Sequence, residues 1–335
     1  MRWLVTGGAG FIGTNTVLNL AESGEEVVIL DDLSRPKVSE NAVFIKDRTG
    51  LKVNKIDISK KEQLASFLSE EKEFDVIINL AGQVSLLESI ENPFRDFEIN
   101  AVGPLNFLEH IRKNCPETLF INMSSNKVYG ALDYVDIIET TSRYEAPNYQ
   151  NGFSEKTKLD FHGPYGCSKG AADQYLNDYR RIYGLRTVSL RQSAVYGPFQ
   201  KPMSDQGWLA FMIQEVLAGR SIALNGVGKQ VRDLLHVDDL IELFRLLSTT
   251  STPLTSSSFN VGGGAMNQIS ILELFGLLTD QYGLRPTYSF GSMRPGDQKI
   301  FVSDNTLISN CLGWKPTINI ADGIKSMVLT EQQRS

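Results

Sequence analysis

The sequence predicts an α/β protein whose first part is a doubly wound parallel sheet and whose second part is a smaller, interleaved C-terminal α/β lobe. Three observations lead to this fold class. Short apolar runs alternate with helix-length amphipathic stretches, the first run leads into a glycine-rich turn, and the alternation loosens after about residue 195. Such alternation is typical of parallel sheets with helices on both faces. We therefore expect one domain over 1–194, with contributions from about 230–260, and a second lobe over 195–335.

The apolar runs and the amphipathic stretches give the expected elements in order. Strands are expected at 3–5, 27–30, 53–56, 76–80, 119–123 and 187–190. Helices are expected at about 12–22, 60–71, 95–113, 168–183, 208–219, 238–248, 269–282 and 320–332. The Ser- and Thr-rich stretch 248–258 predicts an exposed loop.

The bulk composition limits the classes of protein to consider. Of the 335 residues, 41% are hydrophobic and 21% are charged, which is a globular composition. The net charge is -6 and no basic stripe is present, so we expect neither nucleic acid nor a membrane as a partner. The three cysteines fit no zinc-site or disulfide spacing, which predicts reduced thiols, no metal and a cytoplasmic location. The apolar start indicates a first strand rather than a signal peptide, because Thr and Gly interrupt it at residues 6–8.

A glycine-rich turn joins the first expected strand to the first expected helix. Gly7, Gly10 and Gly13 have the spacing G-x-x-G-x-x-G, and Asp31 ends the second strand 18 residues after Gly13. Glycines let the backbone approach a pyrophosphate, the helix N-terminus favours the anion, and the carboxylate can bind the ribose hydroxyls. A Rossmann-like dinucleotide site is therefore expected, with NAD favoured over NADP although Arg35 is close by. The expected cofactor contacts in this region are Gly7, Gly10, Phe11, Ile12, Gly13, Asp31 and Asp32.

A second motif, Y-x-x-x-K, supplies candidate catalytic residues. Tyr165 and Lys169 are four residues apart and share one helix face. We expect the Lys169 ammonium to lower the pKa of the Tyr165 phenol, so that the phenol can act as a base. Ser124 and Ser125 follow the fifth strand, where doubly wound sheets bind ligands, and a hydroxyl there can hold a substrate oxygen. Ser125, Tyr165 and Lys169 are therefore the predicted catalytic residues.

These motifs and their order resemble the extended short-chain dehydrogenase/reductases, the family of NAD-dependent sugar epimerases and dehydratases, from the first strand to about residue 330. The matching positions are the glycine turn, Asp57, Ile58, Leu80, Ala81, Gly82, Asn100, Ser125 with residues 128–130, Tyr165 to Lys169, and Arg191 with residues 196–198. The resemblance implies bound NAD, with Asp57 and Ile58 beside the adenine and Lys169 on the nicotinamide ribose. It adds as cofactor contacts Leu80, Ala81, Gly82, Gln83, Asn100 and Ser124. It also implies a homodimer or a homotetramer, paired through helices 95–113 and 164–183.

The resemblance also narrows the reaction. Dehydratases of this family carry an Asp-Glu pair directly after the catalytic hydroxyl residue, whereas Asn126 and Lys127 stand here, so dehydration is not expected. Several stretches resemble the family's epimerases that act at C2 of CDP-linked sugars, although Ser125 stands where those enzymes would have Thr. These stretches are 81–83, 125–130, 159–175, 205–208 and 228–233. A nucleotide-sugar reductase and a non-enzymatic NAD(P)-binding sensor are the alternatives, although a sensor would be expected to lose one of the three catalytic residues.

The implied reaction is an epimerisation by transient oxidation. Tyr165 would take the proton of the sugar hydroxyl while hydride moves to NAD, and hydride would then return to the other face of the keto sugar. The second lobe is expected to bind the nucleotide sugar, with Arg232 and Arg294 at the diphosphate, because guanidinium groups match phosphate geometry. The predicted substrate contacts are Gln83, Ser125, Asn126, Lys127, His162, Gln192, Gln206, Gly207, Trp208, Arg232 and Arg294.

Overall fold

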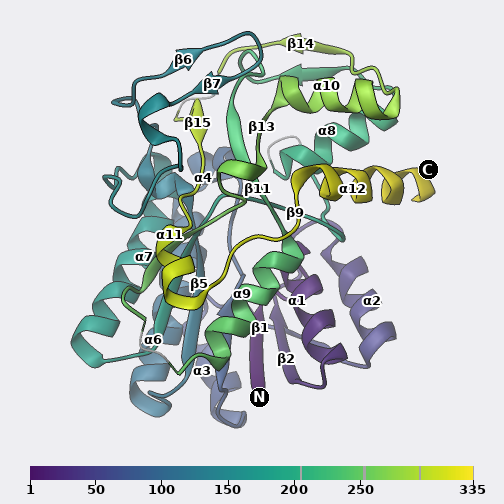
Figure 1. Ribbon diagram of the computed structural model, residues 1–335. Coiled ribbons are helices and arrows are strands. Elements are labelled where there is room, and N and C mark those ends of the chain that lie inside the picture. The colour runs from purple at the N-terminus through teal and green to yellow at the C-terminus, as the bar shows by residue number, and fades with distance from the viewer. Residues whose placement is uncertain (204–205, 252–253, 294–295, 335) are drawn as a thin grey trace.

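A computed structural model describes residues 1–203, 206–251, 254–293 and 296–334 of the chain. Its centre is a seven-stranded sheet in the order β12-β8-β5-β4-β1-β2-β3, in which every neighbouring pair of strands is parallel (Figure 1). The strands are β1 (Arg2–Thr6), β2 (Glu26–Asp31), β3 (Val53–Lys55), β4 (Val76–Asn79), β5 (Leu119–Ser125), β8 (Thr187–Gln192) and β12 (Ser258–Val261). Because β2 and β4 lie on opposite sides of β1, the chain winds outward in both directions, which confirms the predicted doubly wound, Rossmann-like α/β class.

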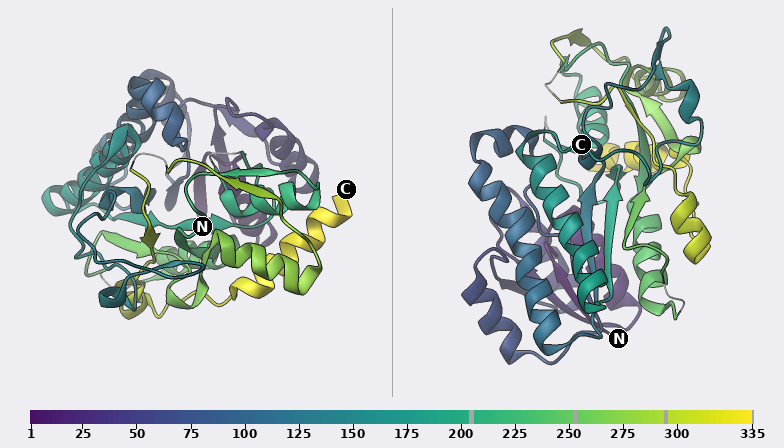
Figure 2. Two further views of the ribbon diagram at one scale, coloured as in Figure 1. Left: turned by 90° about the horizontal axis from the view of Figure 1, so that it is seen from above. Right: turned by 90° about the vertical axis from the view of Figure 1, so that its left-hand side faces the viewer.

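Helices cover both faces of this sheet, because alternate residues of a strand point to opposite sides. In β1, Trp3 and Val5 pack in one apolar layer and Leu4 packs in the other. The first layer holds α1 (Phe11–Glu22), α2 (Val38–Thr49) and α9 (Val237–Thr249), and the second holds α3 (Lys61–Glu70), α6 (Gly103–Asn114) and α7 (Gly163–Tyr183). The right-hand view of Figure 2 shows the sheet between these layers.

The stretch expected as a single helix over 95–113 consists of three consecutive elements. α5 (Pro93–Phe97) and α6 flank a π-helical turn, η1 (Glu98–Val102), and α4 (Leu86–Glu91) precedes them. Asn100, in the π-helical turn, is buried and exchanges hydrogen bonds with the backbone of Gln83. Turns of this kind are frequent at functional sites, and this one lies beside the candidate active site described below.

The second lobe lies above the carboxyl ends of the central strands (Figure 1). Its four-stranded mixed sheet contains β9 (Ala194–Tyr196), β11 (Val231–His236), β13 (Gln268–Ser270) and β15 (Ile300–Phe301). An apolar cluster joins this sheet to α8 (Trp208–Leu217), α10 (Ile271–Tyr282) and α12 (Ile320–Arg334). The remaining short elements are β6 (Ile138–Glu139), β7 (Tyr144–Glu145), β10 (Ile222–Leu224), β14 (Tyr288–Phe290), α11 (Thr306–Leu312), η2 (Asn126–Tyr129), η3 (Pro147–Tyr149) and η4 (Ala265–Asn267).

The two parts of the chain interleave. β12 and α9, both from the second half of the sequence, belong to the large sheet and to one of its helical layers. The expected exposed loop over 248–258 is wrong at both ends, because Ser248 lies in α9, Ser258 begins β12, and both are buried. The domain boundary near residue 194 stays a prediction. In the described ranges, no helix is long and apolar enough to cross a membrane.

Candidate active site

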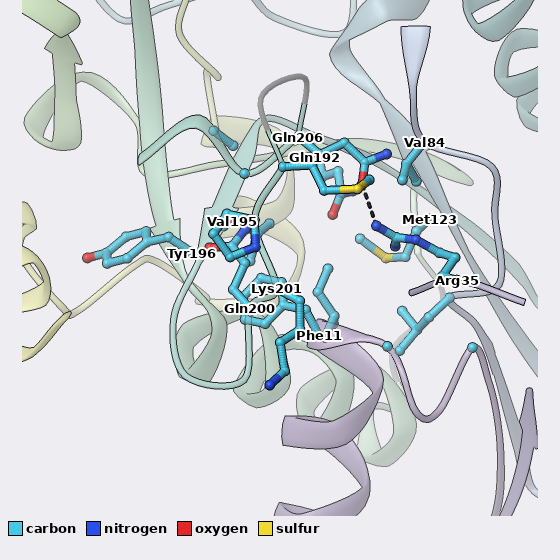
Figure 3. Close-up of a pocket in the computed structure, with 18 of the residues that line it drawn as sticks. Phe11, Arg35, Val84, Met123, Gln192, Val195, Tyr196, Gln200, Lys201 and Gln206 are labelled. Atoms are coloured by element: carbon cyan, nitrogen blue, oxygen red, sulfur yellow. Dashed lines mark hydrogen bonds between the residues drawn. The ribbon is translucent and has the colours of Figure 1, made fainter. Parts of the chain in front are cut away.

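A cavity of about 560 Å³ lies where the second lobe meets the carboxyl ends of the sheet. Its lining combines the turn after β1, the end of β5, the start of α7 and the segment from β9 to α8. Figure 3 shows side chains from both parts of the molecule, including Phe11, Met123 and Gln206, converging on this space. The volume is within the range usual for small-molecule sites, and the place is the expected one for a doubly wound sheet.

The glycine turn brings bare backbone to one end of the cavity. Gly7 has a φ of 62°, and a Cβ there would lie 2.6 Å from the backbone nitrogen of Ala81. A Cβ on Gly13 would lie 2.2 Å from the carbonyl oxygen of Gly7. α1 begins directly after Gly10, and no side chain in the described residues caps its first turn. Its first N–H groups are therefore available to an anion, as the pyrophosphate of a dinucleotide requires.

Asp31 is fixed beside this turn at the end of β2. Its two carboxylate oxygens accept hydrogen bonds from the backbone N–H groups of Ala9, at 3.0 Å, and Leu33, at 2.8 Å. Burial raises the pKa of Asp31, and these two hydrogen bonds act in the opposite direction. A carboxylate oxygen has two lone pairs, so each oxygen can still accept a ribose hydroxyl. The geometry therefore fits the expected ribose contact, although Asp31 is not in the cavity lining.

A charged cluster that the sequence patterns did not indicate follows β2 and β3. Arg95 donates to Asp57 at 2.9 Å and to Ser59 Oγ at 2.8 Å, and lies 3.6 Å from Asp32. Burial acts to raise the pKa of Asp57, but hydrogen bonds from Ser59 and then the contact with Arg95 outweigh it and lower the pKa. Ile58 is buried. Arg95 thus joins the expected adenine contact Asp57 to Asp32, which directly follows the predicted ribose carboxylate Asp31.

The three predicted catalytic residues line the same cavity. Ser125 is the last residue of β5, Tyr165 lies in the first turn of α7, and Lys169 lies one turn later. Ser125 Oγ accepts from the Lys127 N–H at 3.2 Å, and Ser125 lies close enough to Tyr165 to act on the pKa of its phenol. Lys169 Nζ donates to the carbonyl oxygen of Met123 at 3.0 Å. A hydroxyl, a phenol and an ammonium therefore converge at one end of the cavity.

Burial shifts the pKa of both titratable groups in this trio. It raises the pKa of Tyr165 to about 12, although the Ser125 hydroxyl acts in the opposite direction. It lowers the pKa of Lys169 to about 8, against the attraction of the Asp96 carboxylate. The expectation that Lys169 lowers the pKa of the phenol is therefore wrong for the chain by itself, because desolvation dominates.

The charges around the cavity all have one sign. Among the described residues, its lining contains no Asp or Glu and includes the cations Arg35, Lys37, Lys127, Lys169 and Lys201. Arg35 donates a hydrogen bond to Gln206, so a residue close to the glycine turn contacts the segment from the second lobe (Figure 3). A cavity with this electrostatic character fits ligands that carry diphosphate groups.

Many predicted contacts line the cavity, and two of them have buried polar atoms that are unsatisfied. The predicted residues in the lining are Gly7, Gly10, Phe11, Ile12, Gly13, Leu80, Ser125, Asn126, Lys127, Tyr165, Lys169, Gln192, Gln206, Gly207 and Trp208. Gln192 Oε1 and Trp208 Nε1 are buried without a hydrogen-bond partner in the part of the chain that the structure describes. Unsatisfied buried polar atoms that line a cavity are candidates for ligand contacts.

Other predicted residues lie just behind the lining. Ala81 donates its backbone N–H to Thr6 Oγ1 at 3.2 Å. A Cβ on Gly82 would lie 3.1 Å from the polar atoms of both Asn100 and Lys169. Gln83 and Ser124 are buried, and Gln83 Oε1 and Ser124 Oγ find no hydrogen-bond partner among the described residues. These residues border the catalytic trio rather than the open cavity.

Besides Gln83, two further predicted substrate contacts do not line the cavity. His162 is exposed and precedes α7 without a side-chain capping bond from the described chain. Arg232, in β11, is engaged elsewhere: it donates to Asp297 at 2.9 Å and to the carbonyl oxygen of Gln298 at 2.8 Å. In this structure the acidic partner holds the guanidinium of Arg232, and the expected contact with a diphosphate stays a prediction. Arg294 lies outside the described residues.

Sequence reasoning missed several lining residues that carry no motif. They are Arg35, Val84, Met123, Val195, Phe199, Gln200, Lys201 and Met203, most of which Figure 3 labels. Only Arg35 had a signal, since it lies four residues after the ribose carboxylate and is cationic. Of the others, Phe199, Gln200, Lys201 and Met203 lie in the loop after β9. Val84 follows β4, Met123 lies in β5, and Val195 lies in β9.

Comparison with known proteins agrees with this arrangement. Residues 3–262 match the NAD dependent epimerase/dehydratase family. The chain is 38% identical to the CDP-paratose 2-epimerase of Salmonella typhi over 332 residues, which are 98% of each chain. The structure of a UDP-glucose 4-epimerase with UDP-glucose from Thermotoga maritima matches with a TM-score of 0.84 and 30% identity, over 100% of this chain and 99% of that one. The UDP-glucose 4-epimerase of Thermus thermophilus in complex with NAD matches over 100% of both chains, with a TM-score of 0.81 and 30% identity.

The family match covers the whole doubly wound sheet and both catalytic segments. It therefore accounts for the glycine turn, for the carboxylate after β2 and for the trio at the cavity. The chain belongs to the NAD dependent epimerase/dehydratase family, and it is an NAD-dependent enzyme.

Proposed function

We propose that the protein epimerises a CDP-linked sugar at C2 and interconverts CDP-paratose and CDP-tyvelose. The 38% identity to a CDP-paratose 2-epimerase, over almost the full length of both chains, supports this substrate. The observation that favours epimerisation over dehydration is at the end of β5, where Ser125 is followed by Asn126 and Lys127. Dehydration needs an acid and a base to remove water across two carbons, whereas epimerisation by oxidation needs a base only for a hydroxyl proton.

Each residue of the trio has one task in this reaction. NAD, when bound, supplies the chemistry of accepting a hydride from the sugar carbon and returning it. Tyr165 removes the hydroxyl proton as the carbonyl forms, and gives it back once the carbon has inverted. Ser125 holds the substrate oxygen beside Tyr165. With both ligands bound, we expect the positive charge of Lys169 to offset part of the burial that disfavours the phenolate. The cations of the lining bind the diphosphate groups of the two ligands.

The test is a panel of CDP-, UDP-, GDP- and dTDP-sugars incubated with the purified protein, with isomer formation followed by NMR. We expect CDP-paratose and CDP-tyvelose to interconvert without added cofactor, because each cycle regenerates the cofactor. Inversion of UDP-glucose at C4 instead would show that the protein is an epimerase, but it would reject the proposed cytosine nucleotide and the proposed carbon C2. Consumption of added NADPH in proportion to product would identify a reductase and reject the proposal.

We also propose that two copies of the chain pair through α4, α5 and α7. α7 packs against both shorter helices, and large apolar side chains on the three helices are exposed. They are Leu87, Ile90, Phe94, Phe97, Tyr175, Ile182 and Tyr183. Exposed apolar groups that gather in this way are typical of interaction surfaces. Light scattering should give the mass of a dimer or tetramer, and Phe94→Asp should shift it towards the monomer; a monomeric wild-type protein would reject the proposal.

A further inference from the structure

A buried carboxylate lies beside the catalytic trio, and the proposed reaction does not use it. Asp96, in α5, is fully buried. Ser168 Oγ donates a hydrogen bond of 2.5 Å to its Oδ2, and Asn100 Nδ2 donates one of 3.0 Å to its Oδ1. Both oxygens therefore accept hydrogen bonds, which is the pattern of an ionised carboxylate rather than of a carboxylic acid.

Asp96 is connected to Lys169 along two routes. Ser168 directly precedes Lys169 in α7 and is itself buried. On the other side, Asn100 Oδ1 and Lys169 Nζ both lie 3.1 Å from the place where a Cβ on Gly82 would be, so the missing side chain lets the two groups approach. A charge that is fixed in such a dry interior is screened much less than one at the surface.

We propose that Asp96 is a positioning residue whose negative charge keeps Lys169 protonated and sets the pH range in which Tyr165 works. This inference rests on the proposed epimerase reaction. Burial favours loss of the Lys169 proton, and the attraction of Asp96 opposes that loss. The same charge repels a phenolate at Tyr165 and so adds to the raised pKa of that group. The two effects have the same sign, because each moves a titration to higher pH.

The other charged groups on the elements around Asp96 do not take its place. They are Glu88 and Glu91 on α4, Arg95 on α5, Glu98 on η1, and Asp173 on α7. Glu88 and Glu91 are exposed. Arg95 and Glu98 form an ion pair at 3.5 Å, and Asp173 is paired with Arg191 at 2.6 Å. Among the described carboxylates, Asp96 is the one that Ser168, the residue directly before Lys169, binds by a hydrogen bond.

The direct test measures the titration of Lys169 in the protein as purified with its cofactor. Lysines carry ¹³C at Cε, and the Lys169 signal is assigned by its loss in Lys169→Met. Asp96→Asn keeps the side-chain shape and removes the charge. The midpoint of the Lys169 titration should therefore fall by about one pH unit relative to wild type, because an ammonium loses its proton more easily without an opposite charge nearby. Glu88→Gln removes the same charge from the neighbouring helix and should leave the midpoint unchanged. An unchanged midpoint in Asp96→Asn would overturn the proposal.

A second readout separates a charge effect from general damage. In the epimerase assay, Asp96→Asn should move both limbs of the pH–rate profile to lower pH, whereas lost packing would lower the rate equally at every pH. If no CDP-sugar is turned over, the proposed substrate fails. The NMR comparison still decides the role of Asp96 in that case, because it needs no substrate.

A third measurement needs no variant of Asp96. In wild-type protein, protonation of Asp96 should appear as a separate, smaller step in the Cε shift of Lys169 at acid pH, because interacting groups titrate together. Burial raises the pKa of Asp96, which brings this step towards conditions in which the protein is folded. Absence of the step before acid unfolding would overturn the proposal, even where Asp96→Asn does not fold.

Discussion

Replacing Tyr165 with Phe removes the catalytic hydroxyl and leaves the buried ring in place, which separates proton transfer from packing. Ser125 keeps its contacts with Asn126 and with the Lys127 N–H, so the free energy of unfolding should fall by only about 1 kcal/mol. Base catalysis contributes about 10²–10⁴-fold, which is about 3–5 kcal/mol of barrier. We expect Tyr165→Phe to lose activity by that factor, to unfold at nearly the wild-type temperature and to retain NAD.

The assay is the initial rate of CDP-paratose and CDP-tyvelose interconversion, with bound cofactor measured on the same samples. Tyr179→Phe is the matched control, because Tyr179 lies on the same helix, outside the cavity lining, and its hydroxyl donates to Glu109 at 2.8 Å. This control should keep the wild-type rate. A folded, NAD-loaded Tyr165→Phe protein that turns over within about tenfold of wild type would refute the role assigned to Tyr165.

Four further outcomes are expected. Denatured protein should release NAD rather than NADP, as chromatography of the extract will show, because the Asp31 carboxylate repels a 2′-phosphate. Epimerisation in D₂O should leave the inverted carbon without solvent deuterium by mass spectrometry, and label at that carbon would reject epimerisation by oxidation. Asp173→Ala should lower the free energy of unfolding in urea by about 3–5 kcal/mol, because it leaves Arg191 buried without its carboxylate. Asp178→Ala breaks an exposed ion pair and should lower it by about 1 kcal/mol or less. His236, whose pKa burial lowers, binds a proton more readily when unfolded, so thermal stability should fall as the pH drops below about 6.5 towards the folded pKa. His236→Asn keeps a capping acceptor for α9 and should flatten that dependence.

The glycine turn and the Y-x-x-x-K motif could be predicted because each is fixed by a short stretch of chain. Within one strand–turn–helix unit, Gly7 adopts a positive φ and Gly13 approaches the Gly7 carbonyl, and the spacing of Tyr165 and Lys169 places both on one helix face. The positions of these residues therefore follow from local geometry, which a short stretch of sequence is enough to predict. Ser125 could be placed for a similar reason, since it ends an apolar strand of a parallel sheet.

The residues that only tertiary packing brings together could not be predicted in this way. Phe199 and Lys201 lie in the loop after β9, where no periodicity or motif marks them as cavity residues. The pairing of Arg232 with Asp297, which is 65 residues later in the chain, was not expected either. The π-helical turn at Asn100 could not be predicted from the sequence either, because the spacing of apolar residues does not distinguish a continuous α-helix from one that contains a wider turn.

The positions of the carboxylates around the site explain how anion binding and proton transfer are combined. The described lining is cationic, and two carboxylates outside it bind residues at its edge: Asp96 is bound by Ser168, and Asp297 is bound by Lys127 and Arg232. A carboxylate in the lining would repel the diphosphates, and it would be needed only if a carbon-bound proton had to be removed. Carboxylates one step further away attract the cations of the lining without meeting the ligands. Such an arrangement suits a reaction in which the protein moves only a hydroxyl proton, as in the epimerisation proposed here.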